Sequence, residues 1–124
     1  DVILAACHGQ LDNIKDQVEW SDDSAITVVL AANGYPEAPI KGSVLPSLTS
    51  ETSSDDLTIF HAGTTKNNAG QIVSTGGRVL NFTCQGKDLN LCRSKIYEAV
   101  SSFSWDDGFY RSDIGQRLKK KNAA

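Results

Sequence analysis

Apolar residues recur along this chain with two different periods, and these periods predict where strands and helices lie. Residues 26–32 form one continuous apolar, β-branched run, which predicts a buried strand, and the turn-forming residues 33–36 end it. Residues 57–85 contain shorter strand-like runs, separated by two turns rich in glycine and asparagine. They predict a meander of three strands at 57–64, 71–74 and 78–85.

Helical spacing occurs in two other segments. Apolar residues recur on one face of residues 88–103, and Asp88 is well placed to cap this helix. Residues 1–14 have a similar face, interrupted by Gly9, and predict the end of an amphipathic helix whose packing partner lies upstream. Residues 109–115 predict a last short extended segment. The chain is thus predicted to be a small, β-rich α+β domain, with an antiparallel meander and one packed helix.

Composition narrows the class of protein. The 124 residues suit one domain, and an apolar content of 40% with 22% charged residues is ordinary for a globular protein. The net charge of −3 gives no basic field, so we expect neither nucleic acid nor an anionic membrane as a partner. No apolar run approaches the ~18 residues that a membrane span needs. The chain lacks methionine and begins at Asp1, so we expect it to be part of a longer protein.

Candidate metal and redox chemistry is sparse. The three cysteines, Cys7, Cys84 and Cys92, are odd in number and widely spaced. This pattern favours free, mostly buried thiols over a disulfide framework or a zinc motif. His8 and His61 have no ligand-like spacing to other metal-binding residues, and we predict no metal site. No complete catalytic set is visible.

One glycine-rich turn has unusual chemistry. Gly76 and Gly77 directly precede Arg78, so backbone N–H groups stand beside a fixed cation. This arrangement is able to cradle a phosphate or a carboxylate. The alternative is a plain hairpin turn with a solvated arginine. Alternation along the strand predicts that Arg78 shares the apolar face with Leu80, Phe82 and Cys84, where its charge must reach an anion or solvent.

Four motifs occur in a fixed order along the chain. They are residues 26–42 (ITVVLAANGYPEAPIKG), 60–64 (FHAGT), 76–80 (GGRVL) and 110–115 (YRSDIG). Together, over roughly residues 1–117, they resemble the C-terminal domain of the phosphoribosylamine–glycine ligase family, also called glycinamide ribonucleotide synthetases. The resemblance implies that residues 1–20 are the closing helix of a preceding ATP-grasp domain. It also implies a C-terminal domain of barrel-sandwich-hybrid-like type at 21–117 and a tail or linker at 118–124.

The resemblance also implies a function. Enzymes of this family join glycine to 5-phosphoribosylamine at the expense of ATP, in de novo purine biosynthesis in the cytoplasm. Their ATP-grasp domain holds ATP and Mg²⁺ (or Mn²⁺), so we expect this piece to bind no cofactor and to be inactive alone. Its expected partners are the N-terminal and ATP-grasp domains of the same enzyme and small-molecule substrates.

The resemblance gives no residue of the piece a catalytic role, but it makes some candidates for substrate binding. Arg78 and the backbone of Gly76 and Gly77 come first, and His61 and Thr64 are second choices that otherwise fix the geometry of the turn. The last motif, with Tyr110, Arg111 and Asp113, is expected to be an internal Arg–Asp and aromatic lock.

Two other functions remain open. A relative of the family that has lost catalysis would act as a binding or scaffolding domain, and Glu37 and Pro39 depart from the family's usual residues. A swinging-arm carrier needs a lysine at an exposed hairpin tip, often beside methionine. Lys66 lies at a turn, but the chain lacks methionine, which argues against a carrier.

Overall fold

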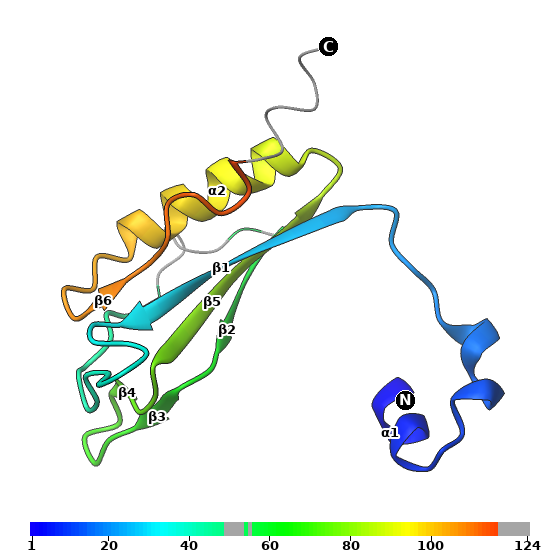
Figure 1. Cartoon of the computed structure of the whole chain (residues 1–124), viewed down its shortest axis with the longest axis horizontal. Coiled ribbons are helices and arrows are strands. Elements are labelled where there is room, and N and C mark those ends of the chain that lie inside the picture. The colour runs from blue at the N-terminus through cyan, green and yellow to red at the C-terminus, as the bar shows by residue number, and fades with distance from the viewer. Residues whose placement is uncertain (49–53, 55, 117–124) are drawn as a thin grey trace.

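The computed structural model describes residues 1–48, 54 and 56–116. In chain order the elements are α1 (Val2–Cys7), the 3-10 helices η1 (Leu11–Asn13) and η2 (Lys15–Gln17), β1 (Ser24–Ala32), β2 (Leu57–His61), β3 (Thr64–Lys66), β4 (Ile72–Ser74), β5 (Arg78–Gly86), α2 (Leu89–Ser102) and β6 (Gly108–Phe109). Figure 1 shows α2 lying along one face of the sheet, while the segment from α1 to η2 lies apart from it. No helix of the described residues is both long and apolar enough to span a membrane.

The main sheet has four antiparallel strands in the order β2-β5-β1-β6. Paired residues of antiparallel strands point to the same side of a sheet, and successive residues alternate. We call the side covered by α2 the helix face; it carries Val28 and its partner Phe82. The opposite side, the open face, carries Thr27 and Thr83, whose hydroxyls are hydrogen-bonded at 2.8 Å.

The core fills the space between the helix face and α2. Phe82 meets Phe103 edge to face, with ring centroids 5.9 Å apart. Asp88 caps α2 as predicted, because its carboxylate accepts from the amides of Asn90 and Leu91. The buried side chains of β1 and α2 in this core are Ile26, Val28, Leu30, Ala32, Cys92, Ile96, Ala99 and Val100.

The predicted class is confirmed, but the order of pairing differs from a meander. β2 pairs with β5, and the shorter β3 and β4 pair with each other in a separate two-stranded sheet. Hydrogen bonds through Gly63 connect the two ladders: its N–H donates to the carbonyl of Arg78, and its carbonyl accepts from Thr75, both at 2.8 Å. Residues 57–86 therefore form one long hairpin, bent where Ala62 and Gly63 face residues 75–77.

A second correction concerns Arg78. The register runs evenly from Ile26–Cys84 to Leu30–Leu80, then shifts so that Ala31 pairs with Arg78. This bulge leaves Val79 as the extra residue, and Val79 and Leu80 are both fully buried. Arg78 therefore does not share the face of Leu80, as alternation predicted. It lies on the open face and is exposed to solvent.

The ends of the chain also differ from the prediction. The first helix stops at Cys7, and Gly9 follows with a φ of +66°, so the expected helix over 1–14 is replaced by α1 and two 3-10 turns. Of the predicted segment 109–115, only Phe109 belongs to a strand. Cys84 and Cys92 are buried as expected, whereas Cys7 is exposed; all three are free. The predicted tail at 118–124 lies outside the described residues.

Candidate functional site

A solvent-open cavity lies at the bend of the long hairpin. Its volume is about 640 Å³. The residues that line it come from the turn after β1, from the bend after β2 and from the start of β5: Tyr35, Ala62, Gly63, Gly77, Arg78 and Asn81. We call this cavity the Arg78 site.

Close backbone packing shapes the Arg78 site. A Cβ on Gly63 would lie 2.7 Å from the carbonyl oxygen of Arg78 and 2.8 Å from the Cα of Gly76. A Cβ on Gly77 would overlap the ring of Tyr35. Gly63 is therefore required by backbone contact, while Gly77 lets the Tyr35 ring pack against the strand that carries Arg78. Gly76 packs behind Gly63 and is not among the lining residues.

The turn that presents Tyr35 is also built on glycine. Gly34 has a φ of +86°, in the left-handed region, and a Cβ there would overlap the carbonyl oxygen of Ala38. The amide of Ala38 donates to the Gly34 carbonyl at 2.8 Å, and Asn33 holds the turn to the segment before β6 by donating to Asp107 at 2.8 Å. Tyr35 is held at the rim with 38% of its surface exposed.

The donors of this site are not engaged elsewhere. Within the described part of the chain, neither the guanidinium of Arg78 nor the amide of Gly77 makes a hydrogen bond. The side chain of Asn81 likewise has no such bond among these residues. Among the residues that the structure describes, no carboxylate lines the cavity. The site thus offers one cation and several free donors, which suits an anion.

A smaller cleft adjoins the Arg78 site and shares Tyr35 and Arg78 with it. Its volume is about 260 Å³, and its other lining residues are Thr27, Val28, Val29, Ala31, Phe109, Tyr110, Arg111 and Ile114. Most of these side chains are apolar or aromatic. The charged Arg78 site therefore lies beside a less polar surface.

Arg111 differs from Arg78 because it already has an anionic partner. Its Nε and Nη2 donate to the two carboxylate oxygens of Asp113, at 2.9 and 2.7 Å. This carboxylate raises the pKa of Arg111 above its usual value. Tyr110 packs against Tyr97, with ring centroids 6.1 Å apart. The predicted Arg–Asp pair and an aromatic contact are present, but the ion pair is exposed at the surface and not internal, with 70% and 52% of its side chains accessible.

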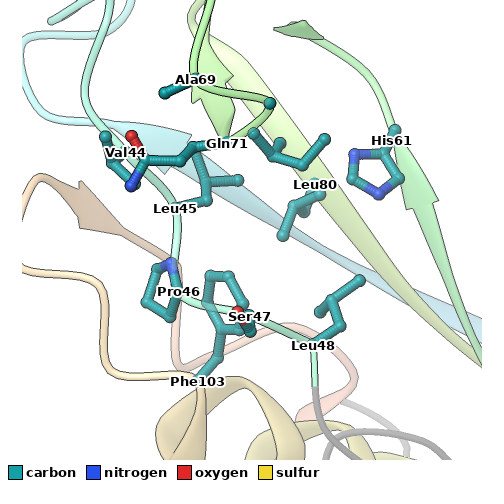
Figure 2. Close-up of a pocket in the computed structure, with 12 residues that line it drawn as sticks. Val44, Leu45, Pro46, Ser47, Leu48, His61, Ala69, Gln71, Leu80 and Phe103 are labelled. Carbon is teal, nitrogen blue, oxygen red and sulfur yellow. The ribbon is translucent and has the colours of Figure 1, made fainter. Parts of the chain in front are cut away.

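The second-choice residues lie elsewhere. His61 pairs in register with Leu80, so it belongs to the helix face, opposite Arg78. Figure 2 shows it beside Leu80 at another cavity, of about 460 Å³, that is lined by residues 44–48, 69–72 and Phe103. Its Nδ1 lies 2.9 Å from Oγ1 of Thr64, which fixes the ring across the bend. The structure thus brings Arg78 and Gly77 together but separates them from His61 and Thr64.

The comparisons with known proteins agree with these motifs. The family described as "Phosphoribosylglycinamide synthetase, C domain" matches residues 25–117. The chain belongs to this family. A phosphoribosylamine–glycine ligase from Arabidopsis thaliana, described as chloroplastic, is 46% identical over 99% of this chain and 23% of its own length. The ligase from Brucella melitensis is 43% identical over 99% of this chain and 28% of its own length.

The fold comparison leads to the same family. The crystal structure of phosphoribosylamine–glycine ligase from Thermotoga maritima matches with a TM-score of 0.62 at 37% identity, over 73% of this chain and 22% of that one. The chain therefore spans about a quarter of the length of the ligases it resembles, and corresponds to their C-terminal part.

Two residues of the Arg78 site were missed as candidates from sequence. Tyr35 belongs to the first family motif, but its neighbours in the sequence do not indicate that its ring packs against Gly77 of the third motif. Asn81 is a polar residue between Leu80 and Phe82, and strand alternation alone places it on the face opposite them. The face on which Asn81 lies was thus predictable. Its place in the site was not, because only the bulge at Val79 puts Arg78 on the same face as Asn81.

No group of three or more histidine, cysteine or acidic side chains that could hold a metal ion occurs among the residues that the structure describes.

Proposed function

We propose that this chain is the C-terminal part of a phosphoribosylamine–glycine ligase and forms one side of its reaction site. The observation that supports this most strongly is the family match over residues 25–117, which includes the three motifs that form the bend and the Arg78 site. The reaction would be the ATP-dependent joining of glycine to 5-phosphoribosylamine in purine biosynthesis.

In the proposed reaction, ATP phosphorylates the carboxylate of glycine to an acyl phosphate. The amine of phosphoribosylamine then attacks this carbonyl, and phosphate leaves. We infer that the ATP-grasp domain holds ATP and Mg²⁺ (or Mn²⁺), so the chain alone is inactive. Its contribution would be to hold a substrate anion, since Arg78 and the Gly77 backbone line an open cavity in which no other described residue is a competing carboxylate.

The role of the other candidates is narrower. Gly76 supports the site through its contact with Gly63. Substrate contacts by His61 and Thr64 stay a prediction, and their mutual 2.9 Å contact favours a role in holding the bend.

The proposed partners are the N-terminal and ATP-grasp domains of the same enzyme. Several apolar side chains near the start of the chain are exposed and would suit such a contact: Val2, Ile3, Leu4, Leu11 and Trp20. The division into a closing helix at 1–20 and a domain at 21–117 stays a prediction. So does a cytoplasmic location, because the relative from Arabidopsis thaliana is described as chloroplastic.

The test is incorporation of isotope-labelled glycine into glycinamide ribonucleotide by the full-length protein, with ATP and phosphoribosylamine supplied. We expect labelled product from the full-length protein and none from this chain alone. Absence of product from a folded full-length protein that binds ATP would contradict the proposal and favour the non-catalytic, scaffolding alternative.

A further inference from the structure

We propose that the Arg78 site binds the 5-phosphate group of the phosphoribosyl substrate and not the carboxylate of glycine. This inference rests on the proposed function and assigns one of its two substrates to this site.

The charges of the site argue against glycine. Free glycine carries an ammonium group one carbon away from its carboxylate. A carboxylate on the guanidinium of Arg78 would bring that ammonium close to a like charge, and the described lining residues include no carboxylate to neutralise it. A phosphate monoester brings no cation with it, so a site with one arginine and no acid favours the phosphate.

The donors of the site also fit a phosphate. A phosphate monoester carries a charge of about −1.5 to −2 and three strong acceptor oxygens. Arg78 supplies a planar fork of N–H groups, and the other lining residues Tyr35 and Asn81 carry a hydroxyl and an amide. None of these three side chains makes a hydrogen bond to another described residue. Arg78 and Asn81 lie on β5 and Tyr35 lies in the turn after β1, so donors from two segments line one cavity. Three donor side chains match the three oxygens of a phosphate, whereas a carboxylate has only two.

The surroundings of the site suit a sugar phosphate. The cavity of about 640 Å³ is open to solvent and shares Tyr35 and Arg78 with the cleft of about 260 Å³. A ligand with one charged end and a less polar body fits this change in polarity. In phosphoribosylamine the phosphate is on C5 and the reacting amine on C1, at opposite ends of the sugar. Binding the phosphate here leaves the amine free to reach glycine on another domain.

The reaction does not change this phosphate, so its contact contributes equally to substrate and transition-state binding. Loss of such a contact raises KM for that substrate and leaves kcat nearly unchanged. It should leave glycine binding unchanged, because glycine binds elsewhere in this proposal.

The test uses calorimetric titration of the full-length protein with ribose 5-phosphate and, separately, with glycine in the presence of ATP. Arg78→Ala should weaken ribose 5-phosphate binding by about 10- to 100-fold, the effect of losing a charge-assisted hydrogen bond. Arg78→Lys should retain part of the affinity. Lys66→Ala, which removes an exposed cation on β3, is the matched control and should bind as the unmodified protein does.

Three outcomes would overturn the proposal: unchanged ribose 5-phosphate binding in Arg78→Ala, a selective loss of glycine binding, or no ribose 5-phosphate binding by the unmodified protein. Thermal unfolding of each variant shows whether a loss of binding reflects loss of the site or loss of the fold. If Arg78→Ala does not fold, the comparison is made with Arg78→Lys, which keeps the positive charge but not the planar fork of donors. Arg78-dependent binding of ribose 5-phosphate by a protein that forms no glycinamide ribonucleotide would support this site and contradict the proposed function.

Discussion

Gly63 lies directly against Gly76, and a Cβ on Gly63 would be 2.8 Å from the Gly76 Cα. This contact joins the second and third family motifs at the bend of the hairpin. It allows the chain to turn from the main sheet into the β3–β4 ribbon while the ladder of hydrogen bonds continues through Gly63. The bend in turn places Arg78 at the mouth of an open cavity.

Gly63→Ala should therefore destabilise the domain, while Gly76→Ala should be tolerated. The methyl group at 63 meets only backbone atoms within 3 Å, which cannot move without disturbing the bend, whereas a methyl at 76 has its nearest neighbour at 3.4 Å. Overpacking of this kind costs about 1–3 kcal/mol. Denaturant unfolding of the two variants measures the difference, and equal stabilities would show that the bend is not constrained by this contact.

Gly77→Ala should disturb the Arg78 site more than the fold. The new methyl group would overlap the Tyr35 ring, which is partly exposed and can swing into solvent. We expect a small change in unfolding free energy and a clear loss of ribose 5-phosphate affinity in the full-length protein. A double-mutant cycle with Tyr35→Ala checks the mechanism, because the effect of Gly77→Ala should nearly vanish once the ring is absent. A full effect in that background would rule out displacement of Tyr35 as the cause.

Sequence reasoning succeeded where the relevant signal was local. The apolar run of β1, the stripe of α2 and the cap at Asp88 each depend on neighbouring residues, and all three were predicted. The Arg–Asp pair of the last motif is also local, since its two residues are two positions apart.

The misplaced features depend on distant contacts. Alternation put Arg78 on the apolar face, because nothing in the strand itself shows that Val79 is an extra residue in the pairing with β1. The pairing of β2 with β5 depends on the bend at Gly63, and this bend is fixed by contact with Gly76, thirteen positions later in the chain. Tyr35 joins the site only through Gly77 in another strand.

The three thiols should differ in reactivity. Burial is the main cause that raises the pKa of Cys84 to about 12, and the neighbouring Cys92 adds to the effect. Thiolate is the reactive form, so Cys84 should resist alkylation at neutral pH, and Cys92 should be protected by burial alone. Iodoacetamide labelling followed by mass spectrometry should modify Cys7 first, and the other two only after unfolding. Rapid labelling of Cys84 in the folded chain would contradict the buried position.

The ion pair between Lys95 and Asp56 should give a pH-dependent contribution to stability. The hydrogen bond from Lys95 lowers the pKa of Asp56 below 3.8. The contribution of Asp56 is therefore present above about pH 3.8 and is lost as the pH falls through the lower, folded-state pKa. The same contact raises the pKa of Lys95 above 10.5, so its contribution is lost only at more alkaline pH.

Lys95→Met should thus lower the thermal midpoint slightly at neutral pH, because the pair is partly exposed. The difference from the unmodified chain should disappear in strong acid, where Asp56 is protonated. Thermal unfolding followed across this range tests the expectation. A difference that persists unchanged in strong acid would show that the lysine contributes through packing instead.

The assignment of Arg78 is tested most directly by the steady-state kinetics of the full-length protein with Arg78→Ala, alongside Lys66→Ala as the control. The account predicts that KM for phosphoribosylamine rises by about 10- to 100-fold in Arg78→Ala, while kcat, the KM for glycine and the control stay near their unmodified values. An unchanged KM for phosphoribosylamine in a stably folded Arg78→Ala enzyme would contradict it, and would reduce the Gly-Gly-Arg turn to a structural bend.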